Sequence, residues 1–329
     1  MLTKRWRENG KTIIEIFTQG IPISEFQDNI DTIENALNQR ITKIEEGRNK
    51  QYILLHLAPG NAKLPEKIYL PQLEAHLPKI LLGESLDGPV VVDLNKQPHL
   101  LIAGSTGSGK TTLVKSIIAQ LLTRTKDMAC LCDVYLIDLK GGLDYPPSWR
   151  GQMCSFSSSA QDALSLLSYV VQELEQRKIK FAMAGNQHNK TCSSLEDYNQ
   201  LCPENSLRRI AVVIDEIAEL TDSTGMSKEQ KDLAKSIVAQ LSTLARLGRA
   251  FGINLFLGTQ RPDATAIPGQ IKNNLDVRIC GKADQTLSMI ILDNTSASEL
   301  IPKDSQGLFI NQDGTIFRGY LLDESMEGV

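Results

Sequence analysis

Short apolar runs alternate with longer amphipathic segments along most of this chain. Four runs rich in Leu, Ile and Val indicate buried strands, over residues 100–103, 134–137, 210–214 and 253–257. Apolar residues three or four positions apart predict helices from Leu113 onward, over 160–184 and over 231–247. Strands alternating with helices favour an α/β fold, in which a mostly parallel sheet is covered on both faces.

The first 82 residues have a different pattern and predict a small N-terminal α/β subdomain. Residues 12–17 and 52–57 are prone to form strands, and Ser24-x-x-Gln27 resembles a helix capping box. Apolar residues from Phe26 to Ile44 then step by three or four, which predicts one helix that ends at Gly47. We therefore expect two domains, 1–82 and 83–329. Residues 81–93 are expected to connect them, and the polar stretch 186–209 to form a surface excursion.

Composition narrows the class of protein. The chain has 329 residues and a net charge of −4, which argues against a broadly basic surface that coats nucleic acid. Its six cysteines contain no C-x-x-C pair, and its four histidines do not cluster with them, so we expect reduced thiols and no metal cluster. No apolar stretch approaches the roughly 18 residues of a membrane span, and the N-terminus has no signal-peptide pattern. We expect a cytoplasmic protein.

A glycine loop carries the clearest chemical signal. The strand at 100–103 is followed by Gly104-x-x-x-x-Gly109-Lys110-Thr111 and then by a helix, which is the context of a Walker A phosphate-binding loop. Backbone N–H groups and the helix N-terminus would bind the phosphates of ATP. Lys110 would reach the β- and γ-phosphates, and the Thr111 hydroxyl would bind Mg²⁺. The predicted ATP site comprises Gly104, Ser105, Thr106, Gly107, Ser108, Gly109, Lys110, Thr111 and Thr112.

Two strands end in Asp, so two carboxylates compete for the place beside Mg²⁺. Asp138 is followed by Leu, whereas Asp215 is followed by Glu216. An ATPase needs one carboxylate near the metal and another that orients or deprotonates the attacking water. We assign Asp215 to Mg²⁺, as a Walker B residue, and Glu216 to water activation. Asp138 and Lys140 could face the same crevice, and their role stays open.

Three further polar residues are candidates for the same reaction. Gln260 follows the strand at 253–257 and could sense the γ-phosphate. A glutamine whose side-chain amide merely stabilises a turn is nearly as good an explanation. A positive charge is needed against the transferring phosphoryl group, and Arg246 and Arg249 lie at a helix end just before this strand. The sequence leaves the choice between these arginines and ordinary surface charge open.

The stretch LARLGRAFGINLFLGTQRP, residues 244–262, resembles the ARAxGIHLxLATQRP block of the FtsK/SpoIIIE DNA translocases. The similarity continues through 269–274, 278–279 and 291–293. Upstream, ELEQR at 173–177 is similar to the family's EMERR helix, and 98–111 to its PHLLxAGxTGSGKS block. The resemblance extends from about Gly83 to Asp323.

This resemblance implies a RecA-like P-loop ATPase motor that forms a homo-hexameric ring and pumps double-stranded DNA through its pore. It assigns Arg249 to an arginine finger in the neighbouring subunit's site, and Arg261 and Lys272 to loops that contact the DNA backbone. A few charges per subunit, multiplied around a ring, would reconcile DNA binding with an acidic chain.

The chain also departs from the family. The family's second pore loop carries Lys and Arg where this chain has Gln285 and Met289. With no winged-helix domain and no membrane anchor in the sequence, we expect a compact motor for a conjugative element, plasmid or phage. Its membrane-associated or relaxosome partner would be supplied by other proteins. A type VII-like protein-secretion ATPase is the alternative within the same ATPase family, and a small-molecule P-loop kinase is the alternative outside it.

Overall fold

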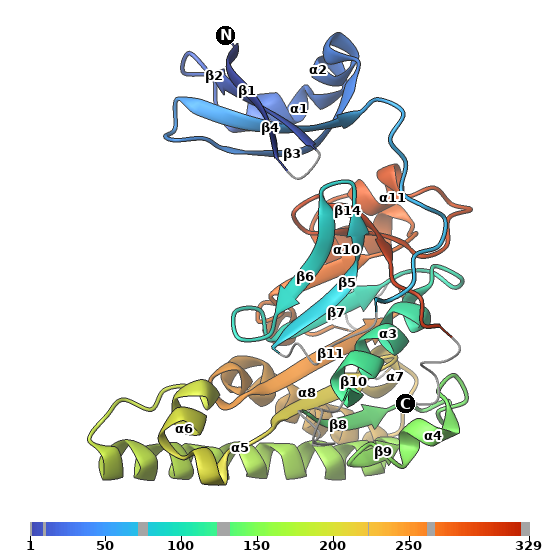
Figure 1. Cartoon of the computed structure of the whole chain (residues 1–329). Helices are drawn as coiled ribbons and strands as arrows, with labels where there is room; N and C mark the ends of the chain where they lie inside the picture. The colour runs from blue at the N-terminus through green and yellow to red at the C-terminus, as the bar shows by residue number, and fades with distance from the viewer. Residues whose placement is uncertain are drawn as a thin grey trace.

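The computed structural model of the chain describes residues 2–8, 11–71, 78–123, 132–222, 224–261 and 267–323. Two sheets organise it (Figure 1). A four-stranded sheet at the N-terminus is joined by a linker to a ten-stranded sheet with helices packed on both sides. Three residues that belong to the sequence patterns above lie outside these ranges: Cys130, one of the six cysteines, His76, one of the four histidines, and Pro262, the last residue of the stretch 244–262.

The small sheet is antiparallel, with the order β1-β2-β4-β3. It consists of β1 (Leu2–Glu8), β2 (Lys11–Phe17), β3 (Gln39–Glu46) and β4 (Tyr52–Pro59), with α1 (Ile23–Asp28) and α2 (Ile30–Leu37) packed against it. The predicted single helix through Ile44 is wrong, because the helical segment stops at Asn38, where φ is +49°, and Ile41 and Ile44 lie in β3. The predicted capping box is also wrong: α1 follows Pro22 and has no side-chain cap.

The large sheet has the order β6-β5-β14-β13-β12-β7-β11-β10-β8-β9. The strands from β12 to β9 in this order are parallel to one another, and the other four are antiparallel. The strands are β5 (Lys79–Ser85), β6 (Gly88–Asp93), β7 (His99–Ala103), β8 (Cys132–Ile137), β9 (Ser155–Ser157), β10 (Arg209–Ile214), β11 (Ile253–Thr259), β12 (Val277–Cys280), β13 (Leu308–Asn311) and β14 (Ile316–Gly319). The expected mostly parallel sheet is confirmed.

Helices cover both faces of this sheet. The helices and 3₁₀ segments are α3 (Lys110–Leu122), α4 (Pro147–Arg150), α5 (Ala160–His188), α6 (Leu195–Leu201), η1 (Pro203–Asn205), α7 (Ala218–Thr221), α8 (Lys228–Leu247), η2 (Gly248–Phe251), α9 (Gly269–Lys272), α10 (Gln285–Leu292) and α11 (Ser296–Leu300). Alternate residues of the central strands point to opposite faces: Leu101 and Leu255 pack with α5 and α8, whereas Leu100 and Phe256 pack with α3. Burial on both faces explains why these strands are apolar throughout.

Two expectations about connections change with the structure. The predicted boundary after residue 82 falls inside β5, which pairs with β14 and β6 of the large sheet, and 81–93 is largely a β-hairpin. The polar stretch 186–209 also contains α6 and η1. No helix within the described ranges is long and apolar enough to cross a bilayer.

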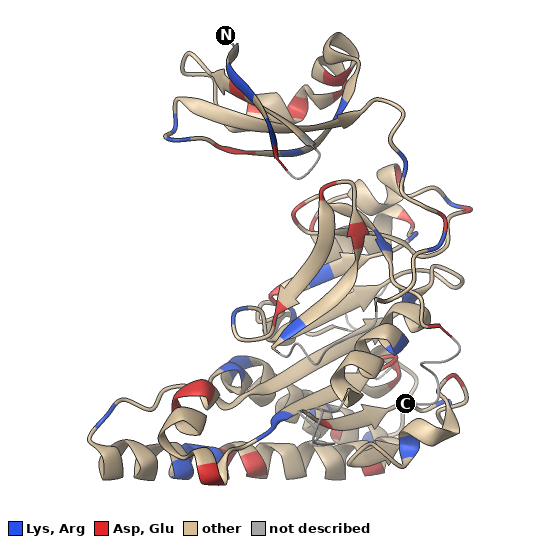
Figure 2. Ribbon diagram, viewed as in Figure 1, with Lys and Arg blue, Asp and Glu red and all other residues tan. Residues whose placement is uncertain are grey.

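The small sheet touches the β5–β6 hairpin at its turn. The Thr42 hydroxyl donates to Asp87 Oδ1 over 3.1 Å, and His56 Nδ1 lies 3.8 Å from the same oxygen. Residues 60–71 form the linker, which runs from β4 down to the large sheet (Figure 1). In Figure 2, Lys and Arg are interspersed with Asp and Glu over both parts rather than gathered on one element.

Candidate nucleotide-binding site

The glycine loop leaves the carboxyl end of β7, at the centre of the large sheet, and leads directly into α3. Its shape depends on glycine at Gly109, where φ is +94° and a Cβ would lie 2.9 Å from the Gly307 nitrogen. The loop is held by hydrogen bonds from Ser108 N to Ser105 O and from Ser105 N to Lys282 O, both 2.9 Å. The predicted residues 104–112 therefore form one loop-to-helix turn, of the type whose N–H groups bind phosphate.

Lys110 and Asp215 are 105 residues apart and meet at this loop. The Lys110 ammonium donates to the backbone carbonyl of Asp215 and lies 3.3 Å from its Oδ1. Both side chains are almost completely buried. Gly258 makes this approach possible, because a Cβ there would lie 2.2 Å from the Asp215 carbonyl oxygen. The structure thus places the predicted cation beside the predicted metal carboxylate.

The two oxygens of Asp215 have different neighbours. Oδ1 accepts a hydrogen bond from the Tyr145 hydroxyl over 3.3 Å. Oδ2 is buried and has no hydrogen-bond partner among the described residues, and the Lys140 ammonium lies 3.6 Å away. A carboxylate oxygen that keeps its lone pairs, together with the hydroxyl of Thr111, is the donor set that Mg²⁺ prefers. These residues therefore fit the metal predicted for this site.

Glu216 links β10 to β11 and the phosphate loop. Its Oε1 accepts a hydrogen bond from the Thr259 hydroxyl and its Oε2 accepts one from the backbone N–H of Gln260, each over 2.8 Å. The Gln260 side-chain oxygen accepts in turn from the Thr106 hydroxyl over 3.2 Å. The predicted Glu216 and Gln260 therefore belong to one network that ends on the glycine loop.

Asp138, the competing carboxylate, is committed to its own turn. Its Oδ1 accepts from Lys140 N over 3.0 Å and its Oδ2 from Gly142 N over 2.8 Å. The carboxylate is buried and shapes the loop after β8, which carries Lys140 and Tyr145 to Asp215. The geometry supports the choice of Asp215 over Asp138.

Sequence reasoning missed Tyr145, Thr259 and Glu219 and left Lys140 open. Burial alone would lower the pKa of Lys140, but nearby carboxylates, Asp215 first, raise it above its ordinary value, so this ammonium stays charged. Burial, and then the charge of Glu216, raises the pKa of Glu219. A strand ending in Asp-Glu signals the carboxylates themselves, whereas nothing local in the sequence singles out a tyrosine eight positions after another strand.

Arg249 lies far from this site within its own chain. It is exposed in η2, before the amino end of β11, and its Nε lies 3.3 Å from the Asn95 carbonyl oxygen. The glycine loop lies at the opposite end of β11, where Gly104 N donates to Thr259 O. Seven strand residues span roughly 20 Å. Arg249, like Arg246 in the last turn of α8, is therefore not brought to the nucleotide site of the same subunit.

The two residues predicted to contact DNA take part in separate ion pairs. Arg261 is exposed and its Nη1 lies 3.3 Å from Asp222 Oδ2. Lys272 is only 20% exposed, and its Nζ lies 2.5 Å from Asp293 Oδ1, while Arg278 binds the other oxygen of Asp293. The structure does not bring Arg261 and Lys272 into contact, and Lys272 is part of a three-residue charge cluster.

Comparisons with known proteins concern the family and the fold of the chain. The model of the FtsK/SpoIIIE family matches residues 71–264. The structure of the pCW3 conjugation coupling protein TcpA, a monomer form with ATPγS, superposes with a TM-score of 0.72 and 34% identity, covering 99% of this chain and 90% of that one. The cytoplasmic domain of the type VII secretion ATPase EccC from Thermomonospora curvata has a TM-score of 0.61 at 21% identity, covering 79% of this chain and 31% of that one, which is a likeness of fold alone.

Curated relatives are longer than this chain. The DNA translocase FtsK of Halalkalibacterium halodurans is 30% identical over 286 residues, which cover 81% of this chain and 34% of the relative. The DNA translocase SftA of Bacillus subtilis is 34% identical over 240 residues, which cover 71% of this chain and 23% of the relative. The matches thus span about a third or less of these relatives.

Proposed function

The chain belongs to the FtsK/SpoIIIE family and is a P-loop ATPase, and on this premise we propose that it is a motor that uses ATP hydrolysis to translocate double-stranded DNA. The observation that carries the proposal is the convergence of Lys110, Asp215 and Glu216 on the glycine loop. The likeness to a conjugation coupling protein over nearly the whole chain supports a use in DNA transfer. The alternative from the sequence was a protein-secretion ATPase. Its support is the likeness of fold to the type VII secretion ATPase EccC.

The site residues divide the chemistry among them. The loop N–H groups and Lys110 bind the phosphates, and Thr111 and Asp215 hold Mg²⁺, which neutralises phosphate charge when bound. Glu216 orients the attacking water and accepts its proton. Gln260 connects Glu216 to Thr106 of the loop, so its position is sensitive to what the loop binds. Lys140 and Tyr145 hold the Asp215 carboxylate in place.

A ring of subunits explains the position of Arg249. A cation against the transferring phosphoryl group is a large part of such catalysis. Arg249 is exposed and separated from its own site by the length of β11, so it would serve the site of a neighbouring subunit. We therefore propose a homo-hexamer in which each site is completed across an interface.

DNA phosphates would bind to cations that are already paired with carboxylates. Arg261 would exchange Asp222 for a phosphate, and Lys272 would be released from Asp293. One partner of each pair is more than half exposed, Arg261 in the first and Asp293 in the second, so water already weakens each ion pair and the exchange costs little. This arrangement supports weak binding by each subunit that becomes strong only when several subunits surround one duplex.

The test compares ATP hydrolysis with and without linear double-stranded DNA. We expect DNA to stimulate the rate. Lys272→Ala should reduce this stimulation, relative to the variant's own DNA-free rate, and flatten the salt dependence of DNA binding by about one phosphate contact. Lys178→Ala on α5, which removes an exposed lysine paired with Glu175, is the matched control and should behave like the parent protein. A rate that DNA does not change would contradict the translocase assignment.

A further inference from the structure

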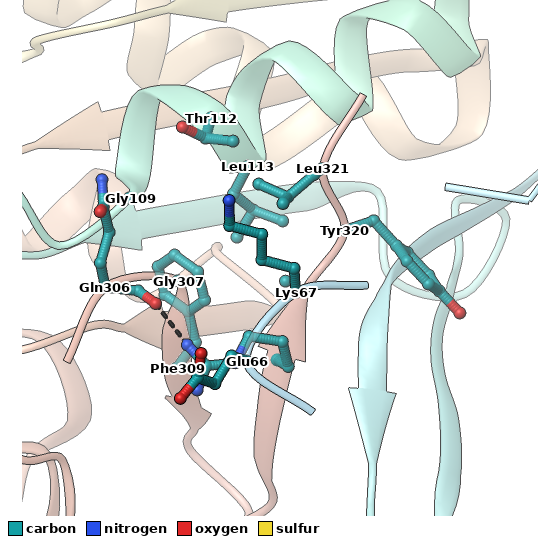
Figure 3. A pocket seen from close by; sticks show the side chains of 12 residues that line it. Glu66, Lys67, Gly109, Thr112, Leu113, Gln306, Gly307, Phe309, Tyr320 and Leu321 are labelled. Carbon is teal, nitrogen blue, oxygen red and sulfur yellow. Dashed lines mark hydrogen bonds between the residues drawn. The ribbon is translucent and has the colours of Figure 1, made fainter. Parts of the chain in front are cut away.

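A pocket of about 250 Å³ opens beside the glycine loop (Figure 3). Gly109 and Thr112 of the loop and α3 form one wall. The strands β13 and β14 and their flanking segments form the second wall. Glu66 and Lys67 of the linker form the third.

The position of this pocket relative to the sheet sets the direction of a bound triphosphate. The glycine loop follows β7. On one side of β7 lie β11 and then β10, which is followed by Asp215 and Glu216, whereas β13 and β14 lie on the other side. The terminal phosphate must lie toward the carboxylates that act on it. The other end of the nucleotide then points toward the pocket, which begins at Gly109 and Thr112, each within two residues of Lys110.

The size and lining of the pocket suit the nucleoside half of ATP. Its volume is below the roughly 300–1,000 Å³ of pockets that enclose a whole drug-sized ligand, so it has room for part of a nucleotide. Leu321 supplies apolar surface for a base, and the buried side chains of Leu113 and Phe309 lie behind it in the apolar lining. The Lys67 side chain extends from the linker toward α3 and supplies a polar group at the rim (Figure 3).

The linker is held at this wall by hydrogen bonds on both sides of Lys67. Arg318 of β14 donates through Nε to the Pro65 carbonyl oxygen over 3.1 Å and through Nη1 to the carbonyl oxygen of Gln306. Leu321 N donates to Ile68 O, and Leu70 N donates to Leu321 O, each over 2.8 Å. Gly307 N in turn donates to Ser108 O of the glycine loop over 2.8 Å. A continuous series of bonded segments thus leads from the loop to the linker.

We propose that this pocket binds the base and ribose of ATP and that the linker is its outer wall, so that nucleotide binding fixes the segment that tethers the small N-terminal sheet. The inference rests on the proposed ATP site and adds to it the location of the nucleoside. It also assigns a role to Lys67 and to the linker, which the catalytic residues do not use.

The first experiment compares two ligands, Mg·ATP and Mg·tripolyphosphate, because the second carries the phosphates without the nucleoside. Leu321→Trp, which fills the pocket, should weaken ATP binding about tenfold or more in calorimetry and leave tripolyphosphate binding within about twofold. Lys67→Ala removes an exposed side chain and should shift binding in the same selective way by a smaller factor. Lys63→Ala, four residues earlier in the linker and outside the pocket, is the matched control.

The outcomes separate this inference from the proposed ATP site. The pocket assignment is supported if Lys110→Ala weakens the binding of both ligands, whereas Leu321→Trp and Lys67→Ala weaken the binding of ATP alone. If both pocket variants bind ATP like the parent protein, or lose both ligands equally, the pocket assignment is overturned. If the parent protein binds neither ligand, the ATP site itself is wrong.

A second experiment follows the linker in the parent protein. Limited digestion with a lysine-specific protease cleaves the exposed linker after Lys63 and Lys67, and the fragments are measured by mass spectrometry. ATP should slow cleavage at Lys67 by severalfold, whereas tripolyphosphate should not. Equal protection by both ligands, or none by ATP, would overturn the proposal that the nucleoside fixes the linker.

Discussion

The Asp215 carboxylate lies close to three polar side chains of the candidate site. Lys110 and Tyr145 contact one of its oxygens, and among the described residues the cation near the other oxygen is the ammonium of Lys140, at 3.6 Å. Bonds to Oδ1 fix the plane of the carboxylate, while Oδ2 remains available to a cation. This division suits a residue that must bind a metal ion without being displaced by it.

Glu216→Gln should separate nucleotide binding from hydrolysis. The amide keeps an oxygen for one of the two hydrogen bonds that Glu216 accepts, from Thr259 and Gln260, but it cannot take a proton from water. We expect ATP turnover to fall about 100-fold or more, with the affinity for a fluorescent ATP analogue little changed. Glu229→Gln, which changes an exposed acid in the first turn of α8, is the control and should retain the activity. Turnover near the parent rate in Glu216→Gln would return attention to Asp138.

At the scale of single residues, the sequence predicts the site residues that belong to a local motif. It misses the residues that the fold brings to the site from other segments. Lys110, Asp215 and Glu216 follow from a glycine loop and a strand that ends in two acids. Tyr145 and Lys140 contact Asp215 from the loop after β8, whose turn is closed by the hydrogen bonds that Asp138 accepts from the N–H groups of Lys140 and Gly142. Such long-range positioning leaves no local pattern.

At the scale of elements, β3 explains why apolar residues spaced like a helix face led to a wrong prediction. Ile41 and Ile44 lie three positions apart, yet both belong to this strand. The pairing of β3 with β4 shifts between Ile41 and Lys43, so that Thr42 is an extra residue, or bulge. Ile41 pairs with Leu57 and Ile44 with Leu55, which puts two residues three positions apart on one face of a strand. A bulge thus reproduces the spacing of a helix face, and the sequence alone cannot separate the two.

His99 joins two central strands and should make stability depend on pH. Its Nδ1 accepts a hydrogen bond from Leu255 N of β11 over 3.1 Å, which requires the neutral ring. Burial lowers the pKa of His99 from 6.5 to about 4, and the nearby backbone of Ala245 offsets this lowering only in part. Between pH 6.5 and 4 the unfolded chain therefore binds a proton that the folded chain does not, so the free energy of unfolding falls as the pH falls.

The test compares the parent protein with His99→Asn, which offers an oxygen to Leu255 N but does not titrate. The variant should be less stable at pH 7.5, because the smaller side chain leaves a cavity. The difference in unfolding free energy should shrink by about 3 kcal/mol between pH 7.5 and pH 4. Urea unfolding followed by the fluorescence of buried Trp149, in a Trp6→Phe background, measures it. A difference that stays constant with pH would show that His99 is not held neutral.

At the scale of the whole molecule, the parallel strands place the proposed functional residues of one chain at opposite ends of the sheet. The glycine loop, Asp215 and Glu216 follow the carboxyl ends of β7 and β10, whereas Arg249 lies before the amino end of β11. The sequence predicts both sets of residues without their separation. That separation makes a subunit by itself incomplete, if Arg249 is the cation that the reaction needs.

The final prediction concerns hybrid rings. If Arg249 acts on the neighbouring site, each site combines Glu216 of one subunit with Arg249 of the next. Arg249→Ala and Glu216→Gln should then each be nearly inactive, since loss of an arginine finger costs about 10³-fold or more. Arg246→Ala, which removes the other exposed arginine at this end of α8, is the matched control and should remain active.

Mixing the two inactive variants should restore part of the DNA-stimulated ATPase. At some interfaces of a mixed ring, the intact Glu216 of the Arg249→Ala subunit meets the intact Arg249 of the Glu216→Gln subunit, and that site is complete. An arginine that acted on its own subunit's site could not be rescued, because no single subunit in the mixture has both residues. Subunits carrying different tags, captured together, establish that mixed rings form. Mixed rings that remain inactive would refute the proposal that Arg249 completes the neighbouring subunit's site. The next candidate for the missing cation would be Arg278, which is paired with Asp293 beside Lys272.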